Sequence, residues 1–253
     1  MNYKNIKKKL DQKGWIIIKR FLSKKEIKKY KNIIYNFLKK NHFKFKGRYI
    51  NYADNSREFK KINSFHKLEE CKSVKNFFYK GKIYDLSQHL LGDFIPELRA
   101  SELFNKPRFC GLKAEPHQDD YYWNVKNNQG ITVWIALDKA NKLNGSVYYY
   151  TGSHKLGLLP HQDSFGKGTS QTVANKNIFK KYKKTYVKLE VGDIVVHNSL
   201  AIHGSEENRS KKNRAGWTFA IKPRDLPYDK KRTTRFLKSL NYQIKLREKN
   251  ARI

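Results

Sequence analysis

The chain has 253 residues and a mass of 30.0 kDa, with 38% hydrophobic and 14% aromatic residues. This composition is sufficient for a buried core and excludes a disordered chain. The absence of any run of 18 apolar residues excludes a membrane-spanning helix, and two cysteines exclude a disulfide framework or a cysteine-based zinc site. The N-terminus lacks the apolar stretch and cleavage site of a secretory signal, so we expect a cytoplasmic protein.

The chain is strongly basic, because 55 lysine and arginine residues against 22 aspartate and glutamate residues give a net charge of +33. Such a charge is typical of proteins that bind nucleic acid or another anionic surface. Here, however, 43 of the 55 are lysines, and they are spread over the whole chain. A dedicated nucleic-acid face is expected to be concentrated and rich in arginine. A genome rich in A/T codons explains the lysine excess as well, so nucleic acid is not the partner that we expect.

The first third of the chain contains patterns of one strand and two helices. Residues 14–20 contain a β-branched run that predicts a short strand. A capping-box pattern and apolar residues at helical spacing then predict a helix over residues 24–40. Residues 72–92 predict a second helix, with Gly92 as its C-cap.

After Pro96 the chain consists of short β-branched or alternating runs separated by Gly, Pro and Asn clusters. Many short strands with turn signals between them are typical of a sandwich or barrel. A basic segment predicts a final helix over about residues 233–249. The predicted strands are residues 131–137, 146–150, 185–189, 193–197 and 216–221.

Two of the eight histidines lie in sequence contexts typical of metal ligands. His117 and Asp119 are two residues apart, so on a strand their side chains share one face. His203 follows a predicted strand and a turn, and we expect it to be the third ligand. Two imidazoles and one carboxylate on one face of a metal leave three positions open, which is typical of non-haem Fe(II) oxygenases. His197, on the same strand–turn unit, is the rival of His203 for the metal.

One arginine is placed where it could bind a carboxylate of the co-substrate of such an oxygenase. 2-Oxoglutarate would chelate the iron through one carboxylate and the keto oxygen, which leaves its distal carboxylate in the pocket. A guanidinium group binds a buried carboxylate with two parallel hydrogen bonds. Arg214 lies eleven residues after His203, on the next predicted strand, and is the candidate for this contact.

Longer segments resemble a known family when they are taken together in their order and spacing. They are HQDDYYW at 117–123, TVWIALDKANKLNGSVYYYTGSHKLG at 132–157 and GDIVVHNSLAIHGSEENRSKKNRAGW at 192–217, preceded by GWIIIKRFLSKKEIKKYK at 14–31. These segments resemble the phytanoyl-CoA dioxygenase-like branch of the Fe(II)/2-oxoglutarate-dependent oxygenases. The resemblance covers roughly residues 10–223.

The resemblance implies a mainly β fold with flanking helices: a double-stranded β-helix, or cupin-like jelly roll, with N-terminal helices packed on it. It implies a single dioxygenase domain over residues 1–253. Within this domain, a helical part would span about residues 1–95 and the β core would span about residues 96–223. A basic C-terminal segment would follow over residues 224–253. The cofactor and co-substrate would be Fe(II) and 2-oxoglutarate, with O2 and a small-molecule substrate as further partners, and anionic molecules are among the candidate substrates.

The resemblance also assigns individual residues. The metal-ligand positions are occupied by His117, Asp119 and His203, and the position that binds the distal carboxylate by Arg214. Three further residues match positions near the co-substrate: Ser205 as a hydroxyl group, Trp134 as an aromatic wall and Lys106 on the strand before the first ligand. The family's reaction would be hydroxylation with release of succinate and CO2.

The sequence also departs from the family pattern, and it leaves alternatives open. Thr151 stands where the family usually has proline, and tyrosines at 148–150 replace more aliphatic residues. These positions shape the pocket wall, so the organic substrate stays open. The alternatives are a non-catalytic binding protein on the same fold, or an oxygenase that acts on an anionic polymer such as nucleic acid.

Overall fold

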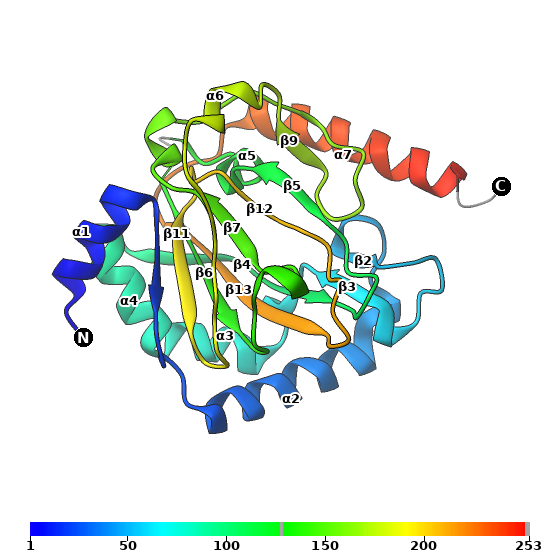
Figure 1. The fold of residues 1–253 in the computed structure, drawn as a ribbon, viewed down its shortest axis with the longest axis horizontal. Helices are drawn as coiled ribbons and strands as arrows, with labels where there is room; N and C mark the ends of the chain where they lie inside the picture. The colour runs from blue at the N-terminus through cyan, green and yellow to red at the C-terminus, as the bar shows by residue number, and fades with distance from the viewer. Residues whose placement is uncertain (127–128, 251–253) are drawn as a thin grey trace.

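The structure is a computed structural model that describes residues 1–126 and 129–250 (Figure 1). Its main element is a seven-stranded antiparallel sheet with the strand order β1-β11-β6-β13-β4-β3-β2. The strands are β1 (Trp15–Ile18), β2 (Ile50–Tyr52), β3 (Ile62–Phe65), β4 (Pro96–Lys106), β6 (Ile131–Ala136), β11 (Ile194–Asn198) and β13 (Arg214–Pro223).

A smaller antiparallel sheet, with the order β10-β7-β12-β5, faces the large one. Its strands are β5 (Ala114–His117), β7 (Val147–Tyr150), β10 (Lys184–Tyr186) and β12 (His203–Ser205), and β8 (His161–Asp163) pairs with β9 (Gln171–Val173) alongside. Trp134 and Val195 of the large sheet pack against Val147 and Tyr149 of the small one. These two facing sheets confirm the predicted jelly-roll fold.

Helices cover the other face of the large sheet, as Figure 1 shows for α2, α3 and α4. The helices are α1 (Tyr3–Lys13), α2 (Lys24–Asn41), α3 (Lys72–Tyr79), α4 (Lys82–Leu91), α5 (Asp119–Trp123), α6 (Asn177–Lys180) and α7 (Lys230–Asn250). Apolar residues of α2 to α4 meet Trp217 and Phe219 of β13 in the largest hydrophobic cluster. All ten residues of β13 are buried: helices cover one of its faces, and on the other face Ala220 packs against Trp123 of α5.

The predicted start of α2 is confirmed, whereas the prediction of one helix over residues 72–92 is not. Ser23 and Glu26 form the predicted capping box at the start of α2. The single helix predicted over residues 72–92 is wrong, because the chain breaks there into α3 and α4. Gly81 is extended and precedes α4, and a Cβ there would lie 2.5 Å from the Phe77 carbonyl oxygen. Gly92 ends α4, as predicted.

The two ends of the described chain are helical. The N-terminal helix α1 was not predicted, whereas α7 confirms the predicted C-terminal helix and begins three residues earlier. In Figure 1, α7 lies across the molecule from α2, on the side of β9 and α5. Residues 251–253 of the predicted basic segment lie outside the described residues. In the described part of the chain, none of the helices is both long and apolar enough to span a membrane.

Phe219 provides a test of the helix–sheet core. Its ring is fully buried and contacts Trp217, Phe77 and Phe78. Phe219→Ala should lower the free energy of unfolding by about 3–5 kcal/mol, because it leaves a cavity between α3 and the sheet. Denaturant unfolding measures this change. The control Phe43→Ala, at a side chain that is 64% exposed, should change stability by less than about 0.5 kcal/mol; equal losses in both variants would contradict this account.

Candidate active site

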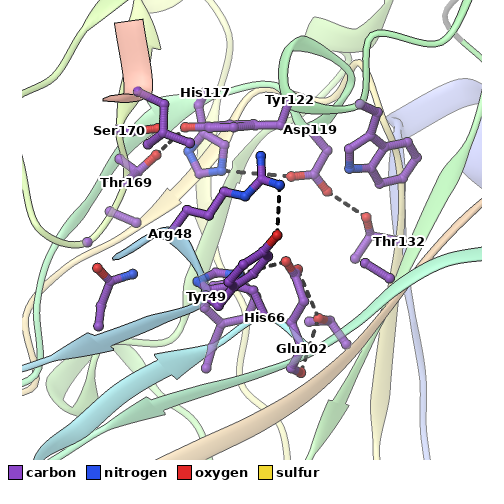
Figure 2. Close-up of a pocket in the computed structure, with 18 of the residues that line it drawn as sticks. Arg48, Tyr49, His66, Glu102, His117, Asp119, Tyr122, Thr132, Thr169 and Ser170 are labelled. Carbon is purple, nitrogen blue, oxygen red and sulfur yellow. Dashed lines mark hydrogen bonds and ion pairs between the residues drawn. The ribbon is translucent and has the colours of Figure 1, made fainter. Parts of the chain in front are cut away.

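Three predicted ligand residues converge between the two sheets. His117 ends β5, His203 begins β12, and the two residues are paired across these neighbouring strands. The Oδ1 atom of Asp119 lies 3.8 Å from Nε2 of His117 and 3.6 Å from Nε2 of His203. One ligand atom from each of the three side chains lies within 4.8 Å of the others, a spacing that suits one metal ion. Figure 2 shows His117 and Asp119 directed toward each other at the cavity.

The local structure around Asp119 differs from the predicted one. We expected His117 and Asp119 to alternate along one strand, but β5 ends at His117 and Asp119 is the first residue of α5. The two side chains still converge because Gln118 between them keeps an extended backbone, with φ −118° and ψ 131°. Its buried side chain donates to the carbonyl oxygens of Gly157 and Leu200, which fixes this junction.

Backbone carbonyls set the orientation of both ligand imidazoles. Nδ1 of His117 donates to the Glu115 carbonyl at 2.6 Å, and Nδ1 of His203 donates to the Ala201 carbonyl at 2.9 Å. Each hydrogen bond places the proton on Nδ1 and leaves the lone pair of Nε2 facing Asp119. Burial lowers the pKa of both histidines to about 4. Both rings are therefore neutral near pH 7, as metal ligation requires.

The second carboxylate oxygen of Asp119, Oδ2, is fixed by hydrogen bonds from residues of the large sheet. Oδ2 accepts hydrogen bonds from the Thr132 hydroxyl at 2.5 Å and from Nε2 of His197 at 2.9 Å. Nδ1 of His197 accepts in turn from the Tyr149 hydroxyl at 2.9 Å. Burial alone would raise the pKa of Asp119, but the imidazole of His203 and the hydrogen bond from His197 outweigh it and hold this pKa below its ordinary value.

These contacts give His197 a position different from that of His203. His203 faces the Oδ1 side with His117, while His197 orients the carboxylate from its other side. The chain Tyr149–His197–Asp119 joins β7, β11 and α5, which are far apart in the sequence. Sequence reasoning missed Thr132 and Tyr149, because neither residue stands in a local motif that indicates this contact.

Two cations lie at one end of the cavity. Arg214 and Lys106 are paired across β13 and β4. The Arg214 guanidinium donates to the carbonyl oxygens of Gly145 at 2.6 Å and Phe104 at 3.2 Å, while its Nε is buried without a partner. Burial lowers the pKa of Arg214 to about 9. Burial, and then the charge of Arg214, hold the pKa of Lys106 well below its ordinary value.

The arrangement of these cations suits an anionic ligand. The Lys106 amine donates to the backbone carbonyls of Leu112 and Glu206. Within residues 1–126 and 129–250, no carboxylate forms an ion pair with Lys106 or Arg214. Two adjacent buried cations without a counter-charge are costly, and a bound carboxylate would remove that cost.

The other predicted residues lie in the same cavity of about 930 Å³. Ser205 and Trp134 both line it, and the Trp134 ring lies 5.5 Å from the Arg214 guanidinium. The close approach of this ring depends on Gly216, because a Cβ there would lie 1.9 Å from Cζ2 of Trp134. The cavity thus extends from Arg214 past the three ligand residues toward α7.

The far part of the cavity contains polar residues that the sequence did not indicate. The Glu102 carboxylate lies 2.7 Å from Nδ1 of His66, whose Nε2 lies 2.9 Å from the Ser64 hydroxyl. Arg48 extends into the space between Tyr49 and the ligand residues and donates to the Tyr49 hydroxyl at 2.7 Å (Figure 2). These residues come from the short 3-10 turn Gly47–Tyr49 before β2, from β3 and β4 and from the residue after β3, where the sequence had no recognisable motif.

The chain belongs to the phytanoyl-CoA dioxygenase family, because residues 10–216 match the sequence model of that family, Phytanoyl-CoA dioxygenase (PhyH). A phytanoyl-CoA dioxygenase domain-containing protein 1 homolog of Caenorhabditis briggsae is 26% identical over 157 residues, 59% of this chain and 54% of that protein. A probable alpha-ketoglutarate-dependent hypophosphite dioxygenase of Stutzerimonas stutzeri is 30% identical over 132 residues, 51% of this chain and 46% of that protein. The chain spans about half the length of such curated relatives.

Solved structures share the fold. The non-heme alpha ketoglutarate dependent carbocyclase SnoK from nogalamycin biosynthesis superposes with a TM-score of 0.70 and 18% identity, covering 89% of this chain and 85% of that one. EctD from S. alaskensis, solved with 2-oxoglutarate and 5-hydroxyectoine, has a TM-score of 0.71 and 17% identity, covering 89% and 77%. These similarities confirm the jelly-roll core with flanking helices.

Gly216 gives a test of how tightly Trp134 is packed in the cavity wall. Gly216→Ala should destabilise the protein by about 1–3 kcal/mol, because the new methyl group displaces the indole ring. Urea unfolding measures the loss. Gly166→Ala is the matched control, since the nearest atom to a Cβ there is 3.5 Å away, and it should change stability little. Unchanged stability in Gly216→Ala would contradict the packing described here.

Proposed function

We propose that the protein is an Fe(II)- and 2-oxoglutarate-dependent dioxygenase that hydroxylates a small-molecule or acyl-type substrate, with release of succinate and CO2. The observation that supports this most directly is the convergence of ligand atoms from His117, Asp119 and His203 within 4.8 Å. Membership of the phytanoyl-CoA dioxygenase family supports the same reaction class.

In this proposal His117, Asp119 and His203 hold the iron. Bound on one face by three side chains, the metal supplies open positions for the co-substrate and O2 and the oxidising chemistry for a C–H bond. The Glu115 and Ala201 carbonyls keep both imidazoles in the tautomer that ligates through Nε2. Thr132 and His197 keep one carboxylate oxygen occupied, so that the other faces the metal.

Arg214 receives the distal carboxylate of 2-oxoglutarate in this proposal. Its unpaired Nε and its lack of an ion-paired carboxylate in the described chain support this role. Ser205 and Trp134 line the adjacent wall, and Lys106 adds positive charge beside the guanidinium. The carboxylate of Asp119 also favours hydroxylation over halogenation, because related halogenases have a small residue at this position.

A turnover assay tests the reaction class. The Fe(II)-loaded protein should release succinate from 2-oxoglutarate when screened against a library of anionic and neutral metabolites. Asp119→Ala should weaken metal binding and abolish hydroxylation, because it removes one of three ligands. Asp120→Asn is the matched control and should keep metal binding, since this buried side chain faces Arg232 of α7 at 3.2 Å instead of the three ligand residues. Equal loss of metal from both variants would contradict the assignment.

Arg214→Ala tests the co-substrate contact. It should weaken 2-oxoglutarate binding by about 30-fold or more, or roughly 2 kcal/mol, because a buried carboxylate loses its charged partner. Metal affinity should change little. Arg214→Lys should restore binding only in part, because a point charge cannot form two parallel hydrogen bonds. The measurement is an anaerobic titration of 2-oxoglutarate against the Fe(II) charge-transfer absorbance; superimposable curves would mean that another residue, such as Lys106, holds the co-substrate.

A further inference from the structure

A β-bulge in β4 turns Arg99 toward the cavity. Along the pairing of β13 with β4, Ala220 lies opposite Ala100, whereas the next residue, Ile221, lies opposite Leu98. Arg99 is therefore an extra residue without a partner position. An extra residue of this kind shifts the alternation of side chains on a strand and changes where they point.

The change of alternation is visible in the neighbours of Arg99. Beyond the bulge, Leu98 packs on the helix side of the sheet with Leu103. Ala100, Glu102 and Arg99 line the cavity. Strict alternation from Glu102 would have placed Leu98 in the cavity and Arg99 among the helices. Because of the bulge, Arg99 lines the cavity and Leu98 packs against the helices, instead of the reverse.

Arg99 forms no ion pair in the described part of the structure. One terminal nitrogen donates to the Tyr122 carbonyl at 3.1 Å, and Nε is buried without a partner. In residues 1–126 and 129–250, no carboxylate lies within ion-pair distance of Arg99, and Glu102 is occupied by His66 at 2.7 Å. Burial lowers the pKa of Arg99 from its ordinary value. Burial disfavours the charged guanidinium, and the nearby carboxylates of Glu102, Asp119 and Glu69 act on it only from beyond ion-pair distance, which favours a ligand that supplies a directly paired anion.

The hydrogen-bonding pattern of Arg99 and the aromatic ring beside it resemble those of Arg214. Both guanidinium groups donate only to backbone carbonyls in the hydrogen bonds described, and each has an unpaired Nε. Each also lies beside an indole ring, Trp123 at 5.8 Å from Arg99 and Trp134 at 5.5 Å from Arg214. The cavity therefore contains two similar anion-binding environments, and only the one at Arg214 is used by 2-oxoglutarate in the proposed function.

We propose that Arg99 binds the anionic head group, a carboxylate or a phosphate, of the organic substrate. This inference rests on the proposed function, because it assigns the second anion-binding environment of the same cavity to the molecule that is oxidised. Arg99 is thus a specificity-determining residue that selects anionic over neutral substrates.

The sheet register limits the size of that substrate. Thr132, Ala220 and Ala100 lie opposite one another on β6, β13 and β4, so two strand spacings, about 10 Å, separate Thr132 from Ala100. Thr132 contacts the metal-ligand candidate Asp119, and Ala100 is next to Arg99. A head group at Arg99 therefore places the reacting carbon of a small substrate only a few bonds away.

The C-terminal helix supplies the apolar wall for the remainder of the substrate. Four apolar side chains of α7 line the cavity: Phe236, Leu237, Leu240 and Ile244. This helix lies beyond residues 10–216, which match the family, so it belongs to the part of the chain that the family pattern does not describe. A small organic anion with an apolar body matches both the cation of β4 and the wall of α7.

Three probes with one apolar body test the proposal: benzoate, phenyl phosphate and neutral benzyl alcohol. Each is titrated calorimetrically into the 253-residue protein loaded with Mn(II) and saturated with 2-oxoglutarate, so that the Arg214 end is occupied. At least one anion should bind, and benzyl alcohol should bind at least tenfold more weakly. The preferred anion distinguishes a carboxylate from a phosphate head group. If neither anion binds, or if benzyl alcohol binds as tightly, the proposal is wrong.

Variants of Arg99 separate a binding role from a structural one. Arg99→Gln keeps a donor for the Tyr122 carbonyl, and Arg99→Met removes it; both should weaken anion binding at least tenfold, as expected for a charge-assisted hydrogen bond. Neither should lower the thermal unfolding midpoint by more than a few degrees, because each removes a half-buried charge that forms no ion pair. Arg209→Met is the charge-matched control at an exposed side chain, and it should bind like the wild type.

Two results would overturn the assignment to Arg99. One is unchanged anion affinity in a folded Arg99→Gln protein. The other is loss of binding in Arg48→Met alone, which would place the anion at the exposed arginine of the same cavity. Failure of the proposed function is distinguishable, because it appears as the absence of 2-oxoglutarate-dependent succinate release, whereas the probe titrations need no turnover.

Discussion

The geometry of the candidate metal site depends on the contacts that the two oxygens of the Asp119 carboxylate make. One oxygen faces the imidazoles of His117 and His203, and the other accepts hydrogen bonds from Thr132 and His197. Because β6 and β11 of the large sheet supply the second pair, the carboxylate is fixed by the sheet that forms the main core. The relative placement of the two sheets therefore decides whether the three ligand atoms converge, and the helices behind the large sheet stabilise that placement.

The cavity between the sheets has basic side chains at two places, and the carboxylates of Asp119 and Glu102 also line it. Lys106 and Arg214 lie at one end of β4 and β13, and Arg99 lies near the other end of β4. Such an arrangement is unfavourable for stability, since burial disfavours the charged form of each group. A lower stability of the folded protein is expected where basic side chains are buried to bind anions, because binding sites commonly reduce stability. The large positive charge of the surface is a separate property and is not needed for this argument.

Much of the fold and the core of the candidate site were predictable from the sequence. The capping box predicted the start of α2, and short β-branched runs predicted strands of both sheets. His117, Asp119 and His203 were identifiable from spacing and family resemblance, and the structure brings them together. The reason given for His117 and Asp119 was incomplete, because an extended Gln118 before a helix, instead of one continuous strand, produces the convergence. The break at Gly81 was missed because helical periodicity continues across it.

The sequence by itself determined the candidate metal ligands and most of the helices and strands. Residue type, spacing along the chain and apolar periodicity are local properties, so they can be read without the fold. Only the tertiary structure decided the position of His197, which contacts Oδ2 of Asp119 and the Tyr149 hydroxyl because β11 brings it beside residues that are distant in the sequence. It also decided that Arg99 faces the cavity, because a bulge is a mismatch between two strands more than 100 residues apart and leaves no mark in either one alone. Pairing between distant strands is the physical reason why these assignments required the folded chain.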